Sequence, residues 1–249
     1  YVNLQNRPAV LLETHMLKDY GTRVRGSYEF LRALLEVVNR DAGRLIEMNR
    51  AADAATIAAG GRYDGGASVP LRLEPDGTTE PFTLRGFRSK VTKSGISGAR
   101  RIEYTQEPIA ITVLRETSLK VTLAVAPPLA YIVPAQWAPV IEVLRAHGLR
   151  LRRTARAWEG EVETYRCEGP VWHGRPFEGR QVLFQPGEGG LRSGASPGTC
   201  TPVRERLPFP AGSAVVSMEQ RAARVAVPLL EPQDPDSLRA WGVFNAVFE

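Results

Sequence analysis

The sequence predicts an α/β fold, followed by a small, mainly β module. A short apolar run at residues 9–12 lies between Pro8 and a polar cluster, which is typical of a buried strand in an α/β sheet. Apolar residues then recur at helical spacing from Val24 to Met48, which predicts a long amphipathic helix covering that sheet. Beyond Leu149, short strand-like segments alternate with glycine- and proline-rich loops, so we expect a β-rich C-terminal module.

The first half of the chain predicts a strand, a helix and then a β insertion. The strand leads through a turn at residues 19–21 into the long helix, which stops at Gly60-Gly61 because glycine readily terminates helices. The β insertion spans about residues 69–125 and contains a polar loop at residues 90–98. We place its strands at residues 69–73, 81–87, 101–104, 109–114 and 120–125.

The remaining residues close the α/β domain and form the module. A strand ending in Pro134 leads into a helix over residues 136–147, which Gly148 stops. We therefore expect a carboxyl-terminal part of an α/β domain at residues 1–148 and the module at residues 149–249. Within the module, strands are predicted at 149–153, 161–167, 180–184, 201–207 and 214–218, a loop at 187–198, and helical segments at 219–230 and 236–248.

The composition is that of an ordinary globular protein, with 43% hydrophobic and 24% charged residues among 249. The net charge of +5 is modest, and its excess comes from one arginine cluster. Because no aromatic residues are interleaved, we favour a solvated basic face over a nucleic-acid patch and expect no nucleic-acid partner. No apolar run of about 18 residues occurs, so we expect no membrane-spanning segment. The cluster consists of Arg145, Arg150, Arg152, Arg153 and Arg156.

The ends of the chain and its cysteines bear on its origin. The chain begins at Tyr1 without an initiator methionine and ends inside the predicted last helix, so we expect a fragment of a longer protein. Cys167 and Cys200 are its only cysteines and have neither metal-ligand spacing nor a Cys-x-x-Cys motif. They would form one disulfide in a periplasmic or secreted protein. The compartment and the oligomeric state stay open.

A polar cluster after the first predicted strand is the main candidate site. Glu13, His15 and Lys18 lie where that strand should end, and in open α/β sheets the ligand crevice lies beside the carboxyl ends of the strands. A histidine in that position reaches a substrate or a metal ion. The alternative is a structural histidine that is hydrogen-bonded to the neighbouring backbone.

The residues around this cluster resemble a known family. The stretch Leu11-Leu-Glu-Thr-His-Met-Leu-Lys-Asp-Tyr20, followed by Arg23-Val24 and a helix, resembles the region around the last zinc-binding histidine in bacterial members of the zinc carboxypeptidase (carboxypeptidase A-like) family. The similarity is spread over most of the chain. Three later stretches look like the same group: Ala130-Tyr-Ile-Val-Pro-Ala-Gln-Trp137, Arg145-Ala-His-Gly148, and Leu229-Leu-Glu-Pro232 with Asp236-Ser-Leu-Arg-Ala-Trp-Gly242.

The resemblance implies a hydrolase that binds one zinc ion and cleaves peptide or related amide bonds. In such an enzyme His15 would be a zinc ligand, and Glu13 would help to orient it. Lys18 and Arg23, which are close to His15 in the sequence, would pair with a substrate carboxylate. The chain would then be the C-terminal part of a mixed-sheet carboxypeptidase-like domain, with the β module as an extension.

The family also needs a glutamate as general base, carried shortly before the closing strand and helix. Glu116 is the nearest candidate by its order along the chain, although the surrounding residues do not reproduce the family pattern. Two other interpretations stay open for this residue. Glu116 would then be an exposed loop carboxylate, or it would be an ion-pair partner of Arg115 or Lys120.

The upstream part of the family's zinc site has no counterpart in this sequence. The family places His-x-x-Glu before its final histidine, but no histidine precedes His15, and neither it nor His147 nor His173 has a glutamate three residues later. A catalytic zinc site needs three protein ligands, of which this chain supplies one, so we expect the chain alone to be inactive. The alternative is a non-catalytic protein that binds a peptide or a cell-wall fragment on the same fold.

Overall fold

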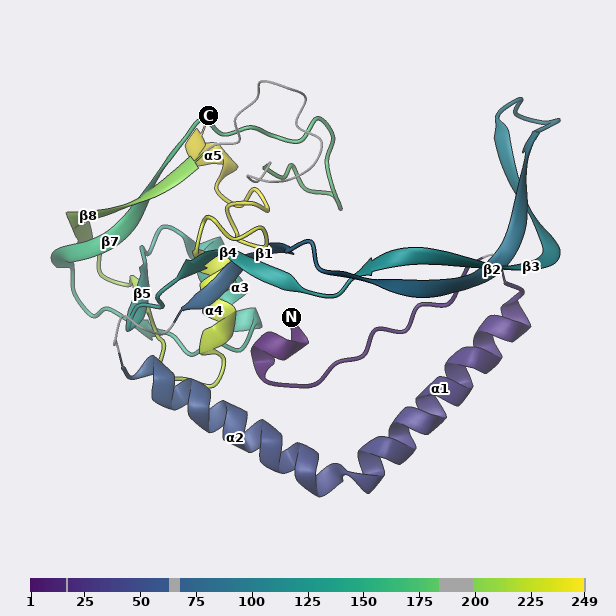
Figure 1. Ribbon diagram of the computed structural model, residues 1–249. Coiled ribbons are helices and arrows are strands. Elements are labelled where there is room, and N and C mark those ends of the chain that lie inside the picture. Colours follow the sequence, from purple (N-terminus) through teal and green to yellow (C-terminus); the bar gives the residue numbers. More distant parts are fainter. Residues whose placement is uncertain (17, 63–67, 184–198, 249) are drawn as a thin grey trace. The chain divides into compact units, whose positions relative to one another are not determined.

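The computed structural model describes residues 1–16, 18–62, 68–183 and 199–248, and it combines helices with four small sheets (Figure 1). The predicted α/β class is therefore confirmed. No extended mixed sheet of the carboxypeptidase kind occurs within those residues, and the registers of three of the sheets are antiparallel. The chain divides into two compact units, Tyr1–Leu71 with Val125–Glu249, and Arg72–Ala124. The domain boundary after residue 148 stays a prediction.

The first segment does not form the predicted strand. A short 3-10 helix, η1 (Val2–Gln5), is followed by residues without regular secondary structure, and Val10 and Leu11 are 59% and 82% exposed. The prediction of a buried strand at residues 9–12 is therefore wrong. A strand needs a neighbour to pair with, and four apolar residues in sequence carry no information about whether that neighbour is present.

Helix α1 (Tyr20–Arg40) begins earlier than predicted. The Asp19 carboxylate accepts a hydrogen bond from the Thr22 backbone N–H at 2.9 Å and so caps the helix, which is why a turn at residues 19–21 is wrong. The helix ends at Arg40, and Asp41 separates it from the next helix, so the predicted single helix is divided in two (Figure 1). None of its described residues is buried, so the predicted covering of a sheet is not seen.

Helix α2 (Ala42–Gly60) ends at the predicted glycine pair. Gly60 is required there by a close approach of two backbones. A Cβ atom on this residue would lie 1.8 Å from the carbonyl oxygen of Met218, a distance at which atoms overlap. Helix α2 therefore packs with its last turn directly on the chain that follows β9.

The unit Arg72–Ala124 contains a long antiparallel pair of strands, β2 (Thr79–Lys93) and β3 (Arg100–Glu116). Two separately predicted strands are merged in β3, and β2 extends into the predicted loop. The register shifts between Phe87 and Ser89, because Phe87 pairs with Pro108 and Ser89 with Tyr104. This irregularity lies at the gap between the two predicted strands. Strand β1 (Val69–Pro75) pairs with β4 (Leu119–Val125).

The core of the larger unit surrounds a three-stranded sheet, in the order β5 (Ala130–Val133), β9 (Ala214–Ser217) and β6 (Arg152–Arg153). Helices α3 (Ala138–Ala146) and α4 (Ala223–Leu230) supply many of the buried side chains. The helix predicted at residues 136–147 and the strands around it are thus confirmed in place, with shorter bounds. The apolar side chains at 1% exposure or less are Val140, Ile141, Leu144, Ala214, Val216, Val225, Ala226 and Val227.

Strands β7 (Trp158–Glu168) and β8 (Thr199–Phe209) form an antiparallel pair that the Cys167–Cys200 disulfide joins near one end. Cross-strand ion pairs accompany it, including Arg206 with Glu159 at 2.6 Å. Residues 180–183 form only isolated bridges, so the strand predicted there is not found in its described part. The loop predicted at residues 187–198 lies outside the described residues.

The C-terminal segment is largely not helical. A helix was predicted over residues 236–248, but α5 (Asn245–Phe248) is only four residues long and turns precede it. Gly242 has a φ of 74°, a left-handed conformation that interrupts a right-handed helix. The side chain of Asp234 accepts a hydrogen bond from the backbone N–H of Asp236 at 2.8 Å, which favours a turn instead.

Candidate functional site

The polar cluster around His15, the predicted zinc ligand, lies on an exposed, irregular segment rather than at a strand end. Glu13, His15 and Lys18 are all exposed between η1 and α1. The backbone N–H of Lys18 donates to the carbonyl oxygen of His15 at 3.1 Å, so a turn brings these two residues together. Their predicted roles, as a zinc ligand and a contact for a substrate carboxylate, stay predictions.

Arg23 lies in the first turns of α1. Its guanidinium carbon is 5.7 Å from the centre of the Tyr20 ring, which is a cation–π distance. Its Nε atom is buried and has no hydrogen-bond acceptor among the described residues. The side chain is thus partly withdrawn from water, and its predicted contact with a substrate stays a prediction.

Glu116 is the last residue of β3 and belongs to the other unit, Arg72–Ala124. It is exposed and lies opposite Thr79 in the strand register. The neighbouring Arg115 forms its ion pair with Glu80 instead of Glu116, whereas the alternative pairing of Glu116 with Lys120 stays a prediction. The role of general base stays a prediction.

The residues that the structure describes contain no group of three or more His, Cys, Asp or Glu side chains that could hold a metal ion. Three protein ligands are the usual minimum for catalytic zinc. The described residues therefore do not fit a zinc ion by themselves. No described helix is both long and apolar enough to cross a membrane.

A polar cluster fixes the N-terminal segment to α2. Asn6 has a left-handed φ of 58° and donates to Asp53 Oδ1 at 3.1 Å and to Thr56 Oγ1 at 3.0 Å. Both terminal nitrogens of Arg7 donate to the Asp53 carboxylate, at 3.0 and 2.8 Å. These bonds, chiefly those from Arg7, lower the pKa of Asp53. Asn6 and Arg7 are thus held by contacts within the chain, which gives them a structural role.

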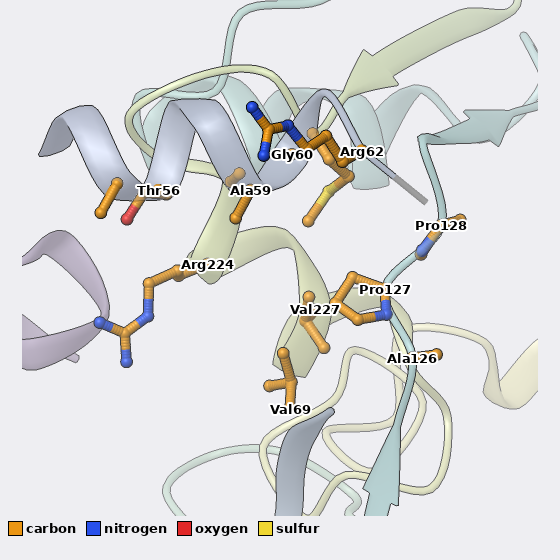
Figure 2. Close-up of a pocket in the computed structure, with 13 residues that line it drawn as sticks. Thr56, Ala59, Gly60, Arg62, Val69, Ala126, Pro127, Pro128, Arg224 and Val227 are labelled. Atoms are coloured by element: carbon orange, nitrogen blue, oxygen red, sulfur yellow. The ribbon is translucent and has the colours of Figure 1, made fainter. Parts of the chain in front are cut away.

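A small apolar pocket of about 310 Å³ lies next to the end of α2 (Figure 2). Val69, Pro127 and Val227 are among its lining residues. Arg224 also lines it, but its Nη1 atom donates to Asn6 Oδ1 at 3.0 Å, away from the pocket. No His, Cys, Asp or Glu of the described chain lines the pocket, so the arrangement suits an apolar group and carries no acid–base chemistry.

A larger cleft of about 910 Å³ is lined mainly by β5, β7 and β8. At its edge Glu231, which is 5% exposed, accepts hydrogen bonds from the hydroxyl groups of Tyr131 and Tyr165, both at 2.6 Å. Burial and the Glu231 carboxylate raise the pKa of both tyrosines. One carboxylate thus joins β5 to β7. Sequence reasoning missed this cluster because its members are 66 and 100 residues away from Glu231, with no shared motif.

Taken together, the fold defines a mixed α/β protein with small antiparallel sheets, and no family model matches the sequence. The chain is similar to Carboxypeptidase 2 of Trichophyton tonsurans, with 26% identity over 127 residues, which are 51% of this chain and 21% of that protein. Carboxypeptidase 2 of Trichophyton equinum shows 26% identity over 127 residues as well. No solved structure matches.

These comparisons support the family resemblance at a coarse level. The likeness is a distant similarity to carboxypeptidases along half of the chain. Because the matched stretch is only 21% of each relative, the chain spans a small part of their length. Both relatives are fungal, so they lend no support to the bacterial group that the motifs suggested.

Proposed function

We propose that this chain is part of a zinc-dependent hydrolase of the carboxypeptidase class that acts on peptide or related amide bonds. The similarity to Carboxypeptidase 2 over 127 residues carries the proposal. The motif around His15, which resembles the family's last zinc-binding histidine, supports it. The disulfide between Cys167 and Cys200 supports export to an oxidising compartment such as the periplasm or the medium.

In this proposal His15 supplies one zinc ligand. His15 is exposed on an irregular segment between η1 and α1. Glu13 would orient His15, Lys18 and Arg23 would pair with a substrate carboxylate, and Glu116 would be the general base. The remaining zinc ligands would come from other parts of the natural polypeptide, so residues 1–249 alone would show negligible hydrolysis.

The test is a comparison of two neighbouring substitutions in the full-length natural protein. We expect His15→Ala to lose both bound zinc and peptide hydrolysis, because a three-ligand site does not survive the removal of one ligand. Met16→Ala is the matched control, since Met16 is 79% exposed on the same segment. Metal analysis and release of a C-terminal amino acid are the measurements. A full-length protein without stoichiometric zinc, or a His15→Ala variant that keeps metal and activity, overturns the proposal.

A second candidate is a non-catalytic protein that binds a peptide or a cell-wall fragment. The cleft of about 910 Å³ beside Tyr131 and Tyr165 favours it, because its volume is in the range of ligand-binding clefts. The two candidates differ in one outcome. The hydrolase releases product from a bound peptide in the presence of zinc, whereas the binding protein returns the peptide intact.

A further inference from the structure

We propose that the cleft between β5 and β7 binds an extended peptide, which adds to the free edge of β5 as a further strand and places a lysine or arginine side chain against Glu161. This inference is independent of the proposed hydrolysis, because it requires neither zinc nor cleavage. It rests on three observations: an unpaired strand edge, a fixed spacing between two strands, and an acidic group without an ion pair.

Strand β5 is paired along only one edge in the part of the chain that the structure describes. It is the outer strand in the order β5-β9-β6. The N–H of Met218 donates to the carbonyl oxygen of Leu129 at 3.0 Å, and pairs in an antiparallel ladder alternate between bonded and non-bonded. The backbone groups of Ala130 and Ile132 therefore point away from β9. No described strand pairs with them, so two N–H and two C=O groups are available to an incoming chain.

The cleft runs along this edge and also reaches one face of the β7–β8 pair, because Leu207 and Phe209 of β8 line it too. All residues from Leu129 to Val133 line it, and so do all residues from Glu161 to Tyr165. Successive side chains of a strand point to opposite faces, so a strand that lines a cleft with consecutive residues presents its edge. The two strands thus face one cleft with their edges, which is the arrangement that strand addition needs.

Glu231 sets the spacing between these two edges. One carboxylate oxygen binds Tyr131 of β5 and the other binds Tyr165 of β7, each at 2.6 Å. Because Glu231 is 5% exposed and follows helix α4, it holds both strands from inside the protein. A cleft with walls fixed in advance loses less conformational entropy when a peptide enters it.

The charges of the β7 wall favour a basic side chain. Arg206 lies opposite Glu161 in the register but forms its ion pair with Glu159 at 2.6 Å. Glu163 is paired with Arg204, at the longer distance of 3.7 Å. Among the residues that the structure describes, Glu161 has no ion-pair partner. A lysine or arginine of the peptide would supply one.

The other groups in the cleft favour apolar neighbours for that basic residue. Ala130, Ile132 and Leu207 line the cleft with aliphatic surface, and Trp158, which is 45% exposed, adds an aromatic ring. Residues two apart in an extended peptide share a face, so basic and apolar side chains would alternate. The ligand class is therefore an extended peptide in which lysine or arginine alternates with β-branched or aliphatic residues.

The experiment measures fluorescence anisotropy of a fluorescein-labelled heptapeptide, Thr-Val-Lys-Val-Lys-Val-Thr, titrated with the protein in EDTA. We expect saturable binding, and we expect Glu161→Gln to raise Kd by about two- to fivefold, as for an exposed ion pair. Glu168→Gln is the matched control, because Glu168 is an exposed glutamate on the same strand outside the cleft. Its Kd should equal that of the parent protein. Since both substitutions are at the surface, circular dichroism should show folded variants.

Two further peptides test the strand geometry without changing the protein. Methylation of alternate backbone nitrogens removes the donors on one edge of the peptide, so one of the two alternately methylated isomers should lose binding and the other should keep it. Equal binding of both isomers, or equal Kd values for Glu161→Gln and Glu168→Gln, overturns the proposal. The proposal is also overturned if binding does not saturate up to about 1 mM peptide. It is overturned as well if sedimentation shows that the protein forms a dimer and does not bind the peptide. Because EDTA is present, these outcomes do not depend on the zinc hydrolase proposal.

Discussion

Helices α1 and α3 carry the same sequence pattern and have opposite environments. Both have apolar residues at helical spacing, yet Ile141 and Leu144 of α3 are 0% exposed, whereas Leu31 and Leu35 of α1 are 53% and 61% exposed. The spacing determines which side of a helix is apolar. It does not determine what covers that side, because the covering surface is encoded elsewhere in the sequence.

The difference lies in what each helix has for neighbours. The buried residues of α3 belong to a core to which β5, β9 and α4 each contribute apolar side chains. Helix α1 is instead held at its ends, by the Asp19 cap and by the junction with α2 at Asp41. We therefore expect substitutions in the core to change the free energy of unfolding strongly and equivalent substitutions on α1 to change it little.

The largest expected effect tests this contrast directly. Leu144→Ala should lower the free energy of unfolding by about 2–5 kcal/mol, because it leaves a cavity in a close-packed core. Leu31→Ala, the same change on α1, should lower it by about 0.5 kcal/mol or less. Chemical denaturation of both variants is the measurement. Equal losses would contradict the exposed position of α1.

A second test asks whether β7 and β8 depend on packing or on their disulfide. Replacing Cys167 and Cys200 together by serine should lower the free energy of unfolding by about 2–4 kcal/mol, because the bond closes a long loop in the unfolded chain. The closed loop has a sequence separation of 33 residues. Thermal unfolding of the double variant, with the reduced parent protein as control, is the measurement. A double variant as stable as the oxidised parent would show that strand packing suffices.

A third test uses pH on the Tyr131–Glu231 contact. Burial and the carboxylate raise the pKa of Tyr131, so the folded state keeps its proton at a pH where the unfolded chain has lost it. The resulting stability is complete below the ordinary tyrosine pKa of about 10 and is lost above it, by at most about 1.4 kcal/mol per pH unit. Tyr131→Phe should flatten this decline.

The control for this pH dependence is Tyr28→Phe, since Tyr28 lies on the exposed face of α1 and is 63% exposed. This variant should keep the slope of the parent protein in urea titrations above pH 10 or so. If Tyr131→Phe has the same slope as the parent protein, the buried contact does not set the alkaline stability.

The smallest expected effect concerns the cap of α1. Hydrogen bonds from Thr22 lower the pKa of Asp19, so the cap stabilises the helix above the ordinary aspartate pKa and is lost as pH falls through the lowered value. Asp19→Ala should reduce hydrogen-exchange protection in the first turn of α1 at neutral pH. Asp41→Ala is the control, because the Asp41 side chain caps no amide of α2. Equal protection in both variants would argue against the cap.

Local signals predicted much of the fold. Gly60 and Gly148 mark helix ends as expected. Strands β4, β5 and β9 coincide with apolar runs that are bounded by turn residues. The failures have two different causes. Residues 9–12 have no neighbouring strand among the described residues. The predicted last helix is interrupted by local turn contacts, such as the hydrogen bond between Asp234 and Asp236, which compete with helical hydrogen bonds.

The candidate site was less predictable than the fold. His15 and Lys18 were grouped because they are close in sequence, and a backbone hydrogen bond does join them in a turn, while their roles stay predictions. The cleft was not found, because Glu231, Tyr131 and Tyr165 meet only through tertiary packing. A glutamate that directly follows an apolar run, as in Leu229-Leu-Glu-Pro232, is the one local signal that could have pointed to this cleft.

The disulfide between β7 and β8 also determines what a protease would release. Any single cut between Cys167 and Cys200 leaves both pieces on one covalent molecule, because the bond bypasses the cut. On a gel without reductant the nicked protein would migrate near its original mass, and only reduction would separate the halves. In an environment rich in peptidases, the C-terminal core would thus stay attached to the rest of the chain after such damage.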